Sequence, residues 1–214
     1  MLWRNQKLNW YYAACFTAFW IILYAAIVVQ QVYRLPTPLT HKDAAKHTGE
    51  FIAERAEDFL FKLTSLGPRV VGSEANEVQA VKLLMDEIRE IENQKSDYFD
   101  FEVDKQVVSG QYSATRLYQS VQNVMVKLSA KTSRSPNYLL INAHFDTKPT
   151  SPGASDDGAM VSVMMELLRI LATSNGPLEH PIVFLFNGAE EESLYASLGF
   201  VRQHKWAKKL QGCD

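Results

Sequence analysis

The longest continuous run of apolar positions lies near the N-terminus. No charged residue occurs between Lys7 and Arg34, and residues 10–29 are almost wholly apolar or aromatic. About 20 such residues, at 1.5 Å per residue in a helix, span the ~30 Å hydrocarbon core of a bilayer. Aromatic residues flank the run at both ends, where Trp and Tyr prefer to lie in membranes. The pattern predicts a transmembrane helix over residues 10–33.

Two other interpretations of this run are a cleaved signal peptide and a buried core helix. A signal peptide has a shorter apolar region of roughly 7–15 residues and a small-residue cleavage site, which residues 28–33 do not provide. A core helix is typically shorter than this run. We therefore expect a signal anchor with residues 1–9 in the cytosol and the rest of the chain in the lumen. Basic residues flank the run on both sides, so the positive-inside rule favours this orientation only weakly.

After this run the pattern changes to alternating helices and strands. Residues 34–49 form a proline-bearing linker, and residues 50–214 form one domain. Helical spacing of apolar residues occurs over 51–63, 78–91, 157–171 and 190–206, and strand patterns occur over 98–108, 117–128, 137–143 and 181–187. The last strand is a continuous apolar run, as expected for a strand buried on both faces. The order predicts an α/β three-layer sandwich with a mixed, largely parallel sheet, truncated at its C-terminal side.

The composition excludes some classes of function but does not identify one. The 22 basic and 24 acidic residues give a net charge of −2, so we expect no nucleic-acid partner. The two cysteines, Cys15 and Cys213, lie in the apolar run and in the last three residues, which provides no disulfide framework.

Polar residues follow two of the predicted strands directly. His144-Phe-Asp146 comes after strand 137–143, and Glu190-Glu191-Glu192 comes after strand 181–187. Ligands of open α/β sheets bind outside the carboxyl ends of strands, so this placement is informative. In His-x-Asp the two side chains point to the same side of an extended chain. The carboxylate can then accept the imidazole N–H and direct the other nitrogen towards a metal, although an isolated pair of this kind is more often structural.

A third acidic block, Asp156-Asp157, lies in a Gly-containing loop before helix 157–171. Taken alone, these aspartates are explained as helix-capping residues, and the three glutamates as a solvated first helical turn. Taken together, the three blocks predict one site where imidazole and carboxylates converge on a divalent cation. Nitrogen and oxygen ligands without cysteine are typical of a hydrolytic zinc centre. Of two adjacent glutamates, one can bind the metal and the other can act as the general base.

Four stretches carry a resemblance to a known family. They are Leu66-Gly-Pro-Arg-Val-Val-Gly-Ser73, the His-x-Asp block, Ser-Pro-Gly-Ala-Ser-Asp-Asp157 and Phe-Asn-Gly-Ala-Glu-Glu191. They resemble the co-catalytic zinc peptidases, which include secreted bacterial aminopeptidases, glutamate carboxypeptidase and glutaminyl cyclase. Within this family they are most similar to the endoplasmic reticulum metallopeptidases. The resemblance implies two Zn²⁺ ions, a peptide or protein substrate, and residence in the endoplasmic reticulum membrane through lipid contact of the N-terminal helix.

The resemblance also implies a role for each residue of the three blocks. The implied metal ligands are His144, Asp156 as the bridge between the two ions, and Glu191; the implied catalytic residues are Glu190 as general base and Asp146, which orients His144. Asp157 would follow Asp156 through a cis peptide bond. The family takes two further ligands, an Asp and a His, from a later part of the domain. The remaining histidine after the glutamates, His204, we expect at the surface and not as a ligand.

These observations predict a membrane-anchored zinc metallopeptidase of the secretory pathway, of the exopeptidase or aminopeptidase type. One alternative is a catalytically incompetent isoform or fragment of that enzyme, because each metal would lack one protein ligand. A second alternative keeps the fold and changes the reaction to glutaminyl cyclisation. The tandem Asp156-Asp157 and Glu190-Glu191 pairs favour the peptidase over the cyclase.

Overall fold

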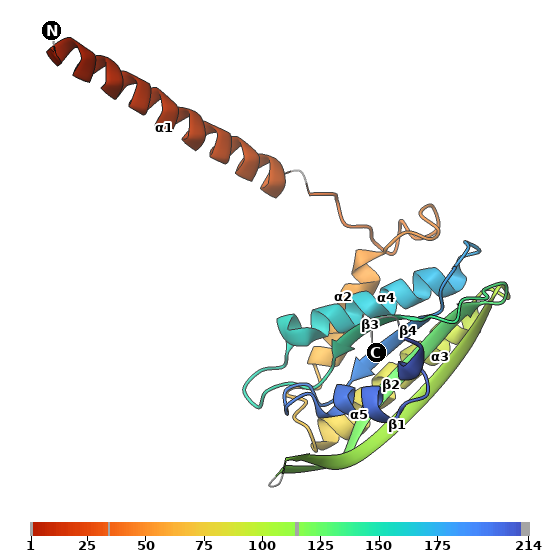
Figure 1. The fold of residues 1–214 in the computed structure, drawn as a ribbon. Helices are drawn as coiled ribbons and strands as arrows, with labels where there is room; N and C mark the ends of the chain where they lie inside the picture. Colours follow the sequence, from red (N-terminus) through yellow and green to blue (C-terminus); the bar gives the residue numbers. More distant parts are fainter. Residues whose placement is uncertain (1, 34, 114–115, 211–214) are drawn as a thin grey trace. The chain divides into compact units, whose positions relative to one another are not determined.

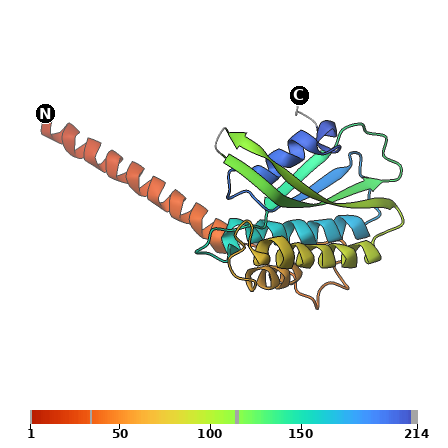
Figure 2. The same ribbon diagram turned by 90° about the horizontal axis from the view of Figure 1, so that it is seen from below.

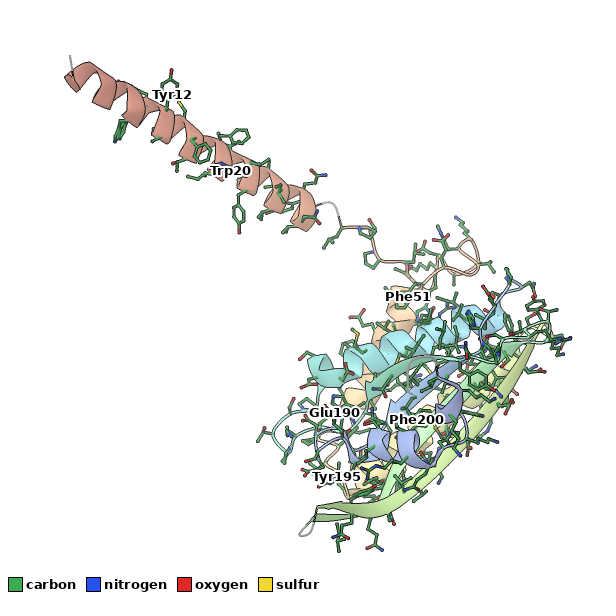
Figure 3. All side chains as sticks on the ribbon, viewed as in Figure 1. Tyr12, Trp20, Phe51, Glu190, Tyr195 and Phe200 are labelled. Atoms are coloured by element: carbon green, nitrogen blue, oxygen red, sulfur yellow. The ribbon has the colours of Figure 1, made fainter. Side chains whose placement is uncertain are left out.

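The computed structural model describes residues 2–33, 35–113 and 116–210, and it divides into two units, Met1–Pro38 and Leu39–Asp214. In the first unit, helix α1 runs over Leu2–Tyr33. Within the described residues, its portion Trp10–Tyr33 is the one helix whose length and composition suit a membrane span. Side chains such as Tyr12 and Trp20 project from it (Figure 3), and its most apolar stretch buries nothing against protein. Such a surface requires an apolar surrounding.

The second unit contains a four-stranded sheet with the strand order β1-β2-β4-β3 (Figure 1). Its strands are β1 (Phe99–Ser113), β2 (Arg116–Ala130), β3 (Leu139–His144) and β4 (Ile182–Asn187). Its helices are α2 (Ala53–Thr64), η1 (Ala75–Ala80), α3 (Val81–Gln94), η2 (Ala154–Gly158), α4 (Ala159–Thr173), α5 (Tyr195–Gln203) and η3 (Ala207–Lys209). Strands β1–β2 and β2–β4 pair antiparallel, whereas β3–β4 pair parallel.

The helices cover both faces of the sheet, which makes three layers (Figure 2). Helices α2, α3 and α4 lie on one face and enclose the largest apolar core, which includes Leu84, Leu168 and Phe184. Helix α5 lies on the other face, where Phe200 and Trp206 pack with Met125 of β2. Strand β4 is buried along its whole length because it has helices on both faces and a strand on each side. Its continuous apolar sequence follows from this position.

The predicted α/β class and the mixed sheet are confirmed. Within the described strands one pairing of three is parallel, so the sheet is less parallel than the prediction stated. One reason is that β1 and β2 are separated by only two residues in the sequence, and strands so close in the chain pair antiparallel. The helices predicted over 51–63, 78–91 and 157–171 are present with small shifts at their ends.

Two predictions near the end of the chain are wrong. The helix predicted over 190–206 covers only Tyr195–Gln203, because Ser193 and Leu194 adopt left-handed backbone angles that break a longer helix. His204 is not at the surface: it is 7% exposed, stacks on Phe200, and its Nε2 lies 3.1 Å from Asp104 Oδ2. Cys213 lies outside the described residues.

Candidate metal centre

The centre is built where the two parallel strands end together. The β3–β4 register pairs His144 with Asn187, and Phe145 N donates to Asn187 O at 2.9 Å. The segments that follow the two strands therefore leave the sheet at the same edge, which is where ligands of α/β sheets bind. Figure 3 labels Glu190 in the segment that follows β4. The sequence prediction that both polar blocks lie at strand ends is thus confirmed.

Asp146 connects the first and third polar blocks. Its carboxylate is fully buried and accepts hydrogen bonds from the backbone amides of Glu190 and Glu191, each at 3.0 Å. Its Oδ1 lies 3.4 Å from His144 Nδ1, and its backbone carbonyl oxygen lies nearer to that nitrogen, at 3.1 Å. The imidazole is therefore oriented by both the carbonyl and the carboxylate of Asp146. The carboxylate also fixes the backbone that carries the two glutamates.

Two carboxylates approach Nε2, the outer nitrogen of His144. Asp156 Oδ1 lies 3.1 Å from His144 Nε2, and Glu190 Oε2 lies 3.7 Å from the same atom. The peptide bond between Asp156 and Asp157 is cis, as the resemblance implied. Asp157 turns away from this group, and its Oδ2 accepts His144 N at 3.4 Å. Burial is the main cause that raises the pKa of the Asp157 carboxyl above its usual value.

Glu191 is the predicted ligand that does not face His144. Its carboxylate pairs with Lys148 at 2.8 Å, and Lys148 also donates to the backbone oxygen of Glu191 at 2.8 Å. The hydrogen bond to this carboxylate raises the pKa of the exposed Lys148. A cation thus already lies beside the third polar block.

The electrostatic environment of His144 favours positive charge. Burial alone lowers the pKa of this imidazole, but the hydrogen bond and charge of Asp146 and the charge of Glu190 outweigh burial. The net result raises the pKa of His144 to about 9. The same carboxylates that stabilise an imidazolium also attract a metal cation to the exposed side of the ring.

The donor chemistry of this group fits zinc. One imidazole nitrogen and several carboxylate oxygens, with no thiolate, are the ligands of hydrolytic zinc sites. The nitrogen available to a metal is Nε2, which faces Asp156 and Glu190, because Nδ1 contacts Asp146. Within the described residues, no three His, Cys, Asp or Glu side chains are already arranged as a metal site. Side-chain rotations at Asp156, Glu190 and Glu191 would be needed to enclose a cation.

Sequence reasoning missed a buried residue that joins the pieces of this centre. Arg69 is fully buried, and its Nε donates to Phe145 O at 2.6 Å. Its Nη1 donates to Pro152 O at 2.8 Å, and its backbone N donates to Thr147 Oγ1 at 2.8 Å. Burial lowers the pKa of Arg69 to about 10, while the charge of Asp146 opposes that shift, so the guanidinium stays charged. A lone arginine inside the compact Gly-Pro-Arg-Val-Val-Gly stretch was the available signal.

The comparison with known families agrees with this geometry. Residues 123–213, which carry all three polar blocks, match peptidase family M28. Over this segment the chain is similar to the M28 metallopeptidases, a class of hydrolases.

A more particular similarity covers most of the chain. It is 44% identical over 179 residues to endoplasmic reticulum metallopeptidase 1 of Homo sapiens, an alignment that covers 81% of this chain and 20% of the human protein. The chain thus spans about one fifth of the length of the curated relatives it matches.

Solved structures share the fold. BSAP, a zinc aminopeptidase from Bacillus subtilis, has a TM-score of 0.60 at 18% identity, covering 75% of this chain and 68% of that one. The glutaminyl cyclase of Porphyromonas gingivalis has a TM-score of 0.57 at 22% identity, covering 72% of this chain and 54% of that one. At these identities the likeness concerns the fold, which hosts both chemistries.

Proposed function

We propose that this chain is the membrane-anchored catalytic portion of a zinc-dependent aminopeptidase of the endoplasmic reticulum. The observation that carries the proposal is the convergence of Asp156 and Glu190 on His144 Nε2, at 3.1 and 3.7 Å. The family match to M28 and the similarity to endoplasmic reticulum metallopeptidases support the same reaction class.

In this proposal His144, Asp156 and Glu191 are the residues that would hold two Zn²⁺ ions, and Asp156 would be the ligand that the two ions share. Zinc supplies Lewis acidity, which polarises a substrate carbonyl and makes a water molecule more acidic. Asp146 keeps the His144 ring in one orientation and the amides of Glu190 and Glu191 in place, as its buried hydrogen bonds allow. For Glu191 to bind metal its carboxylate must leave Lys148, whose own side chain is 55% exposed and can turn towards solvent.

Glu190 is the proposed general base. Its carboxylate is 37% exposed and has no cationic partner other than His144 among the described ion pairs, so it can reach a water molecule beside the substrate. It takes a proton from the water that attacks the peptide carbonyl and delivers it to the departing amine. The amine then leaves as the peptide C–N bond breaks.

The apolar helix defines where the reaction takes place. We propose that residues 10–33 form a signal anchor, that residues 1–9 are cytosolic, and that the peptidase portion after the 34–49 linker is lumenal. The length and apolar surface of Trp10–Tyr33 support the span, and the named relatives support the endoplasmic reticulum. Protease protection of an epitope at residue 210 in microsomes tests the orientation; digestion without detergent would reject it.

The chemistry is tested on the full 214-residue chain in detergent, with three single glutamine variants. Glu190→Gln should retain zinc and lose hydrolysis of aminoacyl-p-nitroanilides, whereas Glu191→Gln should lose zinc as well. Glu192→Gln is the matched control, because this neighbour has no assigned role, and it should behave as the parent. Zinc is measured by plasma emission after dialysis.

The outcomes separate the alternatives. A parent chain that binds no zinc and hydrolyses nothing would reject the proposal in favour of a catalytically incompetent product. Conversion of N-terminal glutamine to pyroglutamate without peptide hydrolysis would favour glutaminyl cyclisation instead. The structural likeness to a glutaminyl cyclase makes this second assay necessary.

A further inference from the structure

The chain between α2 and α3 contains no predicted metal ligand, yet it contacts the three segments that carry the polar blocks. We define it as the 69–77 segment, Arg69 to Glu77. Arg69 binds the backbone next to His144 and in the loop before Asp156, and Asn76 binds the backbone two residues before Glu190. We propose that the 69–77 segment is a positioning element that fixes the spacing of the three ligand-bearing segments. Its meaning for catalysis rests on the proposed function, whereas its effect on the backbone does not.

At one end of the segment, Arg69 joins the first and second blocks. Its Nε donates to Phe145 O, in the middle of His-x-Asp, and its Nη1 donates to Pro152 O, in the loop that leads to Asp156. Thr147 N donates in return to Arg69 O at 2.9 Å. Hydrogen bonds from a buried charged donor are stronger than neutral ones. One guanidinium thus links two strand-end segments that lie about eighty positions later in the sequence.

The same guanidinium is also fixed to its own side of the molecule. Nη1 donates to Leu63 O and Gly67 O, each at 3.1 Å, at the end of α2. Nη2 is buried, and among the described residues it has no hydrogen-bond partner. An arginine held by four carbonyl oxygens has little freedom to move, so the distance between the carbonyls it joins is fixed as well.

At the other end of the segment, Asn76 holds the third block. Its Nδ2 donates to Gly188 O at 2.9 Å and to Glu77 Oε1 at 3.0 Å, and the residue is fully buried. Gly188 N donates to Gln122 O at 3.0 Å, and the Gln122 side chain donates to Glu77 Oε2 at 2.7 Å. The Gly188 peptide, two residues before Glu190, is therefore held at both its amide and its carbonyl.

The backbone before the third block is also closely packed at Gly188. A Cβ at Gly188 would lie 2.4 Å from Phe145 Cζ and 2.9 Å from Gln122 O. Phe145 is the residue whose carbonyl binds Arg69. The two ends of the 69–77 segment thus hold segments that also touch each other, and the three blocks form one rigid frame around His144.

The test uses amide hydrogen exchange on the full chain in detergent, with zinc removed by chelator. Arg69→Met should raise exchange about tenfold in residues 144–158 and leave 188–191 near the parent rate. Asn76→Ala should raise exchange in residues 188–191 and leave 144–158 near the parent rate. Arg55→Met is the matched control: Arg55 also joins two elements, α2 and α4 through Glu166, but contacts none of the three blocks. Any effect of Arg55→Met on exchange should be equal in the two sets. A general loss of stability would raise exchange in both sets equally.

Zinc affinity, measured by competition with a chromophoric chelator, provides the functional readout. Arg69→Met and Asn76→Ala should each weaken zinc binding by about tenfold or more, as is typical for residues that orient metal ligands, and Arg55→Met should not. If Arg69→Met does not fold, Arg69→Lys keeps the charge with fewer aligned donors and should show the same local pattern.

Each result decides one of the two claims. If Arg69→Met and Asn76→Ala raise exchange equally in both sets, or in neither, the positioning role is overturned whatever the zinc data show. The crossed exchange pattern with unchanged zinc affinity overturns its link to the metal centre. A parent chain without zinc rejects the proposed function alone, because the exchange pattern still decides the positioning role.

Discussion

Gly153 should be the glycine of this chain that is least tolerant of alanine. Its φ is +59°, in the left-handed region, which costs a residue with a side chain ~1–2 kcal/mol. A Cβ at this position would also lie 2.3 Å from Thr147 Cγ2 and 2.7 Å from Asp156 O. Overpacking of this kind costs typically ~1–3 kcal/mol, and backbone at Asp156 cannot rotate away. We therefore expect Gly153→Ala to lower the free energy of unfolding by about 2–5 kcal/mol.

The two causes can be measured separately because other glycines show each one alone. Gly49 has a φ of +85° and open space around it, so Gly49→Ala reports only the backbone term. Gly188 has no left-handed φ and a close contact at 2.4 Å, so Gly188→Ala reports only the steric term. Gly176→Ala, with neither feature, is the neutral control. The loss in Gly153→Ala should approach the sum of the first two.

The assay is urea unfolding in detergent, followed by the fluorescence of Trp206. This residue is buried, and it is the single tryptophan of the chain after residue 20, so its signal reports the unfolding of the second unit. If Gly153→Ala destabilises no more than Gly49→Ala, the close approach of the 153–157 loop to Thr147 is not present in the protein. The account of the Asp156 geometry given above would then be wrong.

Three further predictions concern side-chain interactions. Glu166 is nearly fully buried and accepts hydrogen bonds from Arg55 and from the amide of Ile52. Glu166→Leu should therefore destabilise the second unit by about 3 kcal/mol in the same assay, whereas Asp86→Asn, at an exposed ion pair, should leave the midpoint unchanged. Equal midpoints for the two variants would contradict this prediction. The stacked rings of Tyr118 and Tyr195, 4.6 Å apart, should show a coupling of about 1 kcal/mol in a double-mutant cycle with leucine, and a coupling near zero would contradict the stacking. Lys148→Met should strengthen zinc binding about two- to fivefold in chelator competition, because it releases the Glu191 carboxylate, and weaker binding would mean that Lys148 supports the site.

The fold was largely predictable because its signals are local. The apolar periodicity of α3 and α4 extends over three or more turns, and β4 reads as an uninterrupted apolar run. Strand direction was less predictable, since pairing of β2 with β4 joins residues more than fifty positions apart. The early end of the predicted helix over 190–206 depends on left-handed angles at Ser193 and Leu194, for which neither residue type gives a signal.

The site was predictable at the level of segments and not at the level of side chains. That His144 and Glu190 lie near each other follows from strand ends that share one sheet edge. That Glu191 pairs with Lys148, or that His204 is buried against Asp104, depends on contacts between side chains 43 and 100 positions apart. Composition and spacing carry no information on such pairs, and the role of Arg69 was missed for the same reason.

Burial divides the centre into a rigid frame and mobile donors. Asp146, Arg69 and Asn76 are fully buried, and each binds backbone atoms of the ligand-bearing segments. Asp156, by contrast, has a side chain that is 77% exposed, and that of Glu190 is 37% exposed. Exposed carboxylates lose little when they rotate, so they can close around a cation while the backbone stays fixed. Replacement of Asp156 or Glu190 should therefore alter activity or metal binding with little change in stability, whereas removal of a frame residue should alter both.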